Sequence, residues 1–156
     1  MSVDVKEFMR EKFVDAASAY VNDLKAMSHE QLDTSPGGSA RCGYDFTYEV
    51  AYINRRLGAR ISGATPTPPP QGWIKAEDSY KNKDAAIADV ESSAQELLDV
   101  WDALPADDLK RVIELPNGDT THPLDMMWIG VFHFGYHDAQ LNYLQAIFGD
   151  EEVHWE

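Results

Sequence analysis

The segment "HFGYHDAQLNYLQAIFGD", His133 to Asp150, places two histidines four residues apart in a long, mostly apolar run. At a helical step of about 100° per residue, His133, His137 and Gln140 fall on one face. The apolar side chains on the same side mark it as the face that points into a helical core. They are Met126, Ile129, Leu144, Ile147 and Phe148. The segment therefore predicts a helix whose inward face carries two imidazoles.

This helix is expected to run from Pro123 to about Phe148, since proline is tolerated in a first turn and Gly149 provides a C-terminal stop. Its first half, "LDMMWIGVFHF", is apolar almost all the way round, so it is expected to be buried on more than one side. Either a second subunit or a loop carrying Trp73 covers the outer flank. Gly130, which lacks a side chain, is expected to leave room for a solvent molecule or a ligand.

Three further segments repeat apolar residues at three- and four-residue steps, which predicts three more amphipathic helices. They run from Val5 to about Met27, from about Asp45 to Ile61, and from about Lys83 to Leu104. The connection "ATPTPPPQG", Ala64–Gly72, holds four prolines and cannot be helical. The sequence therefore predicts an all-α fold, a four-helix bundle with a long Pro-rich connection between the second and third helices.

One smaller element and the domain organisation follow from the same scan. Arg111–Thr120 is expected to be a short extended piece closed by an Asn117-Gly118 turn. A length of 156 residues suits a single domain over residues 1–156, large enough for a core of its own.

The composition excludes several classes of partner. The formal net charge of −14 opposes binding to nucleic acid or to an anionic membrane surface. No apolar run approaches the length needed to cross a bilayer. One cysteine, Cys42, rules out an internal disulfide, and the charged N-terminal segment is unlike a signal peptide, so a cytoplasmic location is expected.

The inward histidine pair points to a divalent metal, because residues i and i+4 of a helix can reach one ion. Phe134 follows His133, so the glutamate of a helical HExxH protease site is missing and that mechanism is excluded. Glu49, at the flank of the second helix's apolar face, is the best third ligand. The alternatives for Glu49 are an ion pair with Arg55 or Arg56, or plain solvation.

Asp45, one turn before Glu49, is the reserve carboxylate. Two histidines and one carboxylate leave coordination positions open, as in zinc sites that activate water and in non-haem Fe(II) sites.

With these residues in place, the chain resembles the DinB-like (YfiT-like) superfamily of four-helix bundles. The resemblance rests on His133–Asp150 and on "DFTYEVAYINRRL", Asp45–Leu57. In that family a histidine of the second helix joins two of the last helix to bind a divalent metal, often zinc or nickel. Members commonly form dimers, and characterised ones include thiol-dependent S-transferases and a maleylpyruvate isomerase.

Carried over residue by residue, the resemblance matches His133 and His137 to the histidine pair of the last helix and Gln140 to the glutamine that follows it. Glu49 stands where the second-helix histidine is expected, and Ala139 stands where the family usually has glycine.

The resulting hypothesis is a cytoplasmic homodimer that binds zinc, nickel or iron through Glu49, His133 and His137. It acts on a small-molecule substrate as a transferase using a low-molecular-weight thiol, or as an isomerase. Gln140 is assigned to orienting a ligand, and Arg56, if it turns inward, to a substrate carboxylate.

Two alternatives stay open. The bundle is a non-catalytic binding or interaction module with a degenerate or structural metal site, or the dimer pairing is itself the function.

Overall fold

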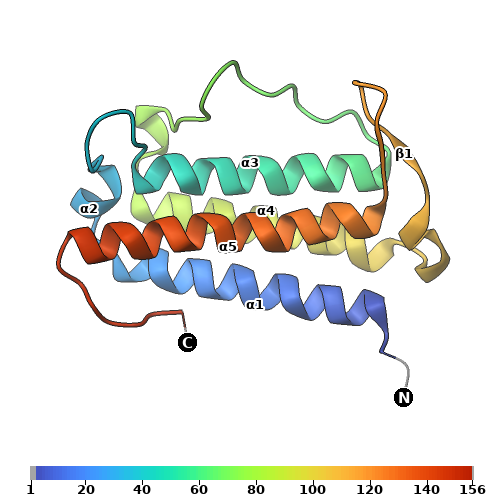
Figure 1. Cartoon of the computed structure of the whole chain (residues 1–156), viewed down its shortest axis with the longest axis horizontal. Helices are drawn as coiled ribbons and strands as arrows, with labels where there is room; N and C mark the ends of the chain where they lie inside the picture. Colours follow the sequence, from blue (N-terminus) through green and yellow to red (C-terminus); the bar gives the residue numbers. More distant parts are fainter. Residues whose placement is uncertain (1–2, 156) are drawn as a thin grey trace.

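A computed structural model describes residues 3–155 and shows a bundle of four long helices (Figure 1). The helices are α1 (Val5–Ala26), α3 (Gly43–Ser62), α4 (Lys83–Ala103) and α5 (Pro123–Ile147). Their apolar faces meet in one core, as the helical periodicity predicts, and the predicted four-helix bundle is confirmed.

The ends of the helices follow local chemistry. The Asp4 side chain accepts hydrogen bonds from the backbone N–H groups of Lys6 and Glu7 and so caps α1. At the end of α3, Gly63 adopts a φ of 81°, a left-handed conformation that stops the helix and turns the chain outward.

The connection that follows, residues 63–82, runs back along the bundle from the end of α3 to the start of α4 (Figure 1). Consequently α3 and α4 run in the same direction, and α1 and α5 run in the opposite one (Figure 1). The connection contains the 3₁₀ helix η1 (Asp78–Tyr80) and is fastened to α3 by Tyr52, whose hydroxyl donates to the Pro68 carbonyl at 2.7 Å.

Smaller elements occupy the two ends of the bundle. The predicted turn closes a hairpin of β1 (Ile113–Glu114) and β2 (Thr120–Thr121), with Gly118 at a φ of 86°. A 3₁₀ helix, η2 (Ala106–Lys110), precedes this hairpin. A short helix, α2 (His29–Asp33), is held by reciprocal hydrogen bonds between Ser28 and Gln31 and was not predicted.

The space beside Gly130 differs from the expectation. A Cβ atom at this position would lie 2.9 Å from the Phe13 ring, so an aromatic side chain from α1 fills the room predicted for solvent or a ligand. Phe13 also packs edge-on against Phe134, with 5.4 Å between the ring centroids. The prediction of a vacant space was wrong because it ignored the ring that the neighbouring helix inserts there.

The outer face of α5 is uncovered within the described part of the chain. Its exposed side chains are Trp128, Ile129, Phe132, Tyr136, Tyr143 and Ile147. The prediction that Ile129 and Ile147 lie on the inward face was wrong, because both are at the edge of the helix where solvent reaches them. Trp73, on the Pro-rich connection, is itself 68% exposed and borders a cavity with Tyr136 and Tyr143 only, so it leaves Trp128 and Phe132 open. Among residues 3–155, no helix combines the length and the hydropathy that a membrane span requires.

Candidate metal centre

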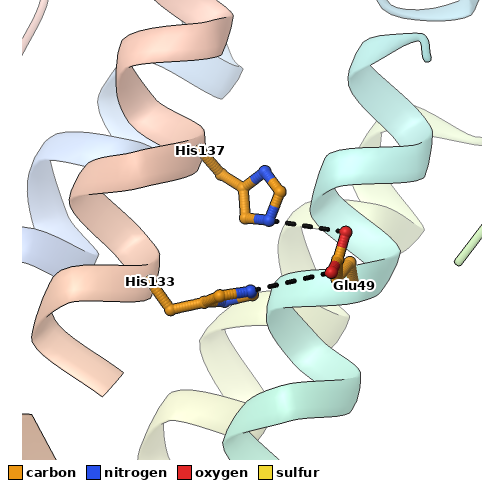
Figure 2. A group of neighbouring side chains, drawn as sticks. All are labelled: Glu49, His133 and His137. Atoms are coloured by element: carbon orange, nitrogen blue, oxygen red, sulfur yellow. Dashed lines mark ion pairs between the residues drawn. The ribbon is translucent and has the colours of Figure 1, made fainter. Parts of the chain in front are cut away.

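The inward face of α5 carries the two histidines as the periodicity predicts. His133 and His137 lie one turn apart, with 4.5 Å between their ring centroids, and both point toward α3 (Figure 2). The side chain of His137 is 1% exposed and that of His133 is 16% exposed. The pair is therefore largely withdrawn from solvent at the interface of α3 and α5.

Glu49 of α3 lies directly opposite the two rings (Figure 2). Its Oε2 is 3.5 Å from His137 Nε2, and its Oε1 is 3.8 Å from His133 Nε2. One candidate ligand atom from each of the three residues lies within 4.8 Å of the other two. The structure thus brings Glu49 together with His133 and His137, which lie more than 80 positions later in the sequence.

Gln140 fixes the tautomer of His137. Its Oε1 lies 2.7 Å from His137 Nδ1. An amide oxygen only accepts hydrogen bonds, so Nδ1 carries the proton and the lone pair resides on Nε2, which faces Glu49. Among the described residues this buried Nε2 has no hydrogen-bond partner. In a metal site, an imidazole lone pair and a carboxylate oxygen both bind the ion that lies between them. Without an ion, the buried lone pair and the carboxylate face each other with no proton between them, which is unfavourable.

The electrostatics keep His137 and Glu49 in the protonation states that bind a metal. Burial, and then the neighbouring His133 ring, lowers the pKa of His137 to about 4, so its imidazole is neutral at pH 7. Burial opposes ionisation of Glu49, but the facing His133 and the guanidinium of Arg41 outweigh it and hold the pKa of Glu49 at about 2. Glu49 is therefore a carboxylate.

Arg41 is the ion-pair partner of Glu49, and the sequence analysis missed it. Its Nη1 donates to Glu49 Oε2 and, at 3.1 Å, to the carbonyl of Ile74. Arg41 is 7% exposed and precedes α3. Because it reaches Glu49 within α3, its side chain lies alongside the helix. The sequence did contain one indication of this pairing: Arg41 is the only lysine or arginine between Lys25 and Arg55, the stretch that contains Glu49.

The other candidates lie elsewhere. Arg55 pairs with Asp89 and Glu96 of α4 rather than with Glu49. Arg56 does not turn inward; it donates to the Thr67 carbonyl on the Pro-rich connection, which removes the geometry assumed for its substrate role. The reserve carboxylate, Asp45, accepts from the backbone N–H groups of Cys42 and Ala76 and so joins the connection to the start of α3.

The three residues fit a divalent ion. Two ligand atoms of a tetrahedral zinc site, each about 2.0–2.1 Å from the ion, are about 3.4 Å apart. The separation of 3.5 Å between His137 Nε2 and Glu49 Oε2 is close to this value. Three protein ligands leave at least one coordination position for a small molecule, which distinguishes reactive metal sites from structural ones.

Two solved structures share the fold. YfiT from Bacillus subtilis, described as a probable metal-dependent hydrolase with an unusual four-helix bundle topology, superposes with a TM-score of 0.74 at 17% identity, covering 96% of this chain and 90% of that one. A conserved protein of Enterococcus faecalis gives a TM-score of 0.72 at 12% identity, covering 95% and 99%. No curated protein sequence matches this chain significantly.

The family comparison covers most of the bundle. Residues 12–141, from the first helix to beyond Gln140 in the last, match the model of the DinB superfamily. The matched range includes Glu49, His133 and His137. This chain belongs to the DinB superfamily.

Proposed function

We propose that the protein binds one divalent metal ion through Glu49, His133 and His137 and uses it in a reaction on a small molecule. The observation that carries the proposal is the buried Nε2 of His137, which faces the Glu49 carboxylate and has no hydrogen-bond partner within residues 3–155. Neutral imidazoles and a carboxylate suit zinc, nickel and iron, so the donor set does not select among them.

Each residue around the site has a defined task. Gln140 holds the His137 ring in the tautomer that offers Nε2. Arg41 keeps the Glu49 carboxylate ionised and directed at the histidines. The ion, when bound, acts as a Lewis acid that lowers the pKa of a thiol or a water molecule.

Thiol transfer is the reaction class we favour, because the resemblance of His133–Asp150 and Asp45–Leu57 is to a family with thiol-dependent S-transferases. The thiol would belong to a low-molecular-weight cofactor. Hydrolysis is the second candidate, since YfiT is described as a probable metal-dependent hydrolase. The two reactions differ in the nucleophile rather than in the site.

Metal content tests the site. Protein purified without an affinity tag is analysed for bound metals, and then titrated with zinc, nickel and Fe(II). We expect up to one ion per chain, and strongly reduced binding in His133→Ala and Glu49→Gln. His154→Ala, which alters a histidine paired with Asp150 outside the cluster, serves as the matched control. A wild-type site that stays empty in every titration would support the non-catalytic module instead.

The nucleophile is tested separately with the cobalt-substituted protein. If a thiol joins the site, adding dithiothreitol or cysteine produces a thiolate-to-cobalt charge-transfer band in the near ultraviolet. His133→Ala treated in the same way provides the baseline. A spectrum unchanged by thiols, combined with turnover of an activated ester, would favour hydrolysis.

We also propose that the exposed face of α5 pairs with a second copy of the chain. Between Met126 and Phe148 the only charged side chain is Asp138, in a protein with a net charge of −14. A second copy can therefore approach this face without local charge repulsion, and it would cover apolar rings that are otherwise exposed. A two-fold axis near Gly135, the midpoint of α5, would bring Trp128 against Tyr143 of the second copy and place Phe132 and Tyr136 of both copies around the axis.

A further inference from the structure

A cavity of about 280 Å³ lies next to the metal cluster, between α3, α5 and the loops on either side of α3. Its walls include four aromatic side chains: Phe46, Trp73, Tyr136 and Tyr143. Two polar groups that touch the cluster, Arg41 and Gln140, also line it. The volume is just below the range for drug-sized ligand sites, about 300–1,000 Å³, so the cavity suits a small ligand.

The guanidinium of Arg41 is held in a fixed orientation. It lies 5.2 Å from the centroid of the Phe46 ring and 4.9 Å from that of Trp73. Its Nη1 donates to Glu49 and to the Ile74 carbonyl. Within residues 3–155, its Nε and Nη2 make no hydrogen bond that meets normal geometry. The Nη1 group is thus anchored, and the N–H groups of the Nε–Nη2 edge are left to donate to a ligand.

We propose that this cavity binds a small aromatic carboxylate. The carboxylate accepts two hydrogen bonds from the Nε–Nη2 edge of Arg41, and the planar ring packs among Trp73, Tyr136 and Tyr143. The proposal deepens the function above by naming a substrate class for the metal site, and to that extent rests on it.

The chemistry of the walls supports this choice. The Nε–Nη2 edge presents two parallel N–H groups, the geometry that matches the two oxygens of a carboxylate. Aromatic side chains prefer offset or edge-on contacts with another flat ring. A flat ring that carries one carboxylate satisfies both features, whereas an alkyl acid uses only the first and a neutral aromatic uses only the second.

The cavity is also coupled to the metal ligands. Phe46 lines the cavity and stacks on His137, with 5.4 Å between the centroids. Gln140 lines the cavity and binds His137 Nδ1. A divalent ion bound by Glu49 would leave the charge of Arg41 less compensated. We therefore expect the carboxylate to bind more tightly to the metal-loaded protein.

Benzoate is a suitable probe. The full-length, metal-free, ¹⁵N-labelled protein is titrated with benzoate, with benzamide as the neutral analogue and with cyclohexanecarboxylate as the non-planar acid. We expect saturable shifts at the Trp73 indole N–H and at the amides of Gln140 and Tyr143. Benzamide should bind about tenfold or more weakly, because the charge-assisted hydrogen bonds are lost.

Variants on the cavity rim locate the binding. Trp73 and Tyr143 are 68% and 67% exposed, so truncating them spares the core. Trp73→Ala and Tyr143→Ala should each weaken benzoate binding about threefold to tenfold, the worth of one aromatic contact. Trp155→Ala, which removes an exposed tryptophan outside the cavity, should have no effect. Arg41→Lys keeps the charge but loses the paired donors, and should reduce the preference for benzoate over benzamide.

The outcomes separate the two proposals. His133→Ala should lose the metal yet still bind benzoate in the metal-free state. Benzoate binding by a protein that takes up no metal would refute the metal site and leave the cavity proposal standing. Metal uptake with no benzoate binding, or with benzamide bound equally well, would overturn the cavity proposal alone.

Discussion

Asp23 of α1 and Asp138 of α5 meet across the helix interface, close enough for their carboxyl groups to share a hydrogen bond. The Oδ1 atom of each is buried, and neither receives a donor from the described part of the chain. Two ionised carboxylates have no proton to share. One proton held between them satisfies both oxygens, and burial together with Asp23 accordingly raises the pKa of Asp138 to about 8.

This carboxyl pair predicts a pH-dependent stability. Because the pKa of Asp138 is higher in the folded state than its ordinary value of 3.8, its contribution to stability is fully present below about pH 4 and is lost as the pH rises toward 8. Asp138→Asn supplies a permanent donor and should raise the Tm of the metal-free protein at pH 8, with a smaller change at pH 5. Asp99→Asn, which removes an exposed acid from α4, controls for net charge. Equal Tm changes in the two variants at both pH values would contradict the shared proton.

Gly130 and Gly58 make a second, matched comparison. A Cβ at Gly130 would lie 2.9 Å from the buried Phe13 ring, whereas one at Gly58 meets only ordinary contacts, the nearest at 3.8 Å. Gly130→Ala therefore adds an overpacking cost of about 1–3 kcal/mol, partly offset by about 1 kcal/mol of helix propensity. We expect a net loss of about 1 kcal/mol, a Tm decrease of about 2–4 °C. Gly58→Ala should leave the Tm unchanged or raise it. A Tm decrease as large as that of Gly130→Ala would refute the conclusion that close packing against Phe13 causes the loss at Gly130.

The ion pair of Arg41 with Glu49 predicts a link between stability and metal. Arg41→Met leaves the Glu49 carboxylate unpaired, and breaking a buried pair costs about 3–5 kcal/mol; because the Glu49 side chain is 18% exposed, we expect the lower end. A bound divalent ion would restore the missing positive charge. In thermal melts, zinc should therefore raise the Tm of Arg41→Met by more than it raises that of the wild type.

Arg55→Met is the control for this experiment, since Arg55 is a half-exposed arginine of α3 paired with Asp89 and Glu96. It should cost about 1 kcal/mol or less and leave the zinc response as in the wild type. An identical zinc response in the two arginine variants would show that Arg41 and the ion do not share Glu49.

The long helices could be predicted because their signal is local. Apolar residues repeat with the helical period, and Gly63 and Pro123 mark helix ends. The same period placed both histidines inward. The helix α2 also had a readable signal, the Ser28–Gln31 capping pair, but five residues are too few for a period to emerge.

The features that were missed depend on contacts between distant segments. Arg41 reaches Glu49 from outside the helix, where periodicity says nothing about side-chain direction. The ring of Phe13 fills the space beside Gly130 from another helix. The aromatic cavity exists only because the Pro-rich connection returns Trp73 to Arg41. None of these contacts leaves a pattern within one segment, so only the folded arrangement reveals them.

The exposed face of α5 makes the last prediction. Trp128 is 58% exposed and Phe132 is 59% exposed, on a helix face whose only charged side chain is Asp125, in the first turn of α5. If two copies pair through this face, Trp128→Glu places a carboxylate in each half of an apolar interface and should shift sedimentation from dimer to monomer without lowering the stability of the monomer. Val112→Glu is the control, since it makes the same charge change at an apolar residue outside α5 that is 59% exposed. A wild-type monomer at high protein concentration, or a dimer that both variants leave intact, would rule out pairing through α5.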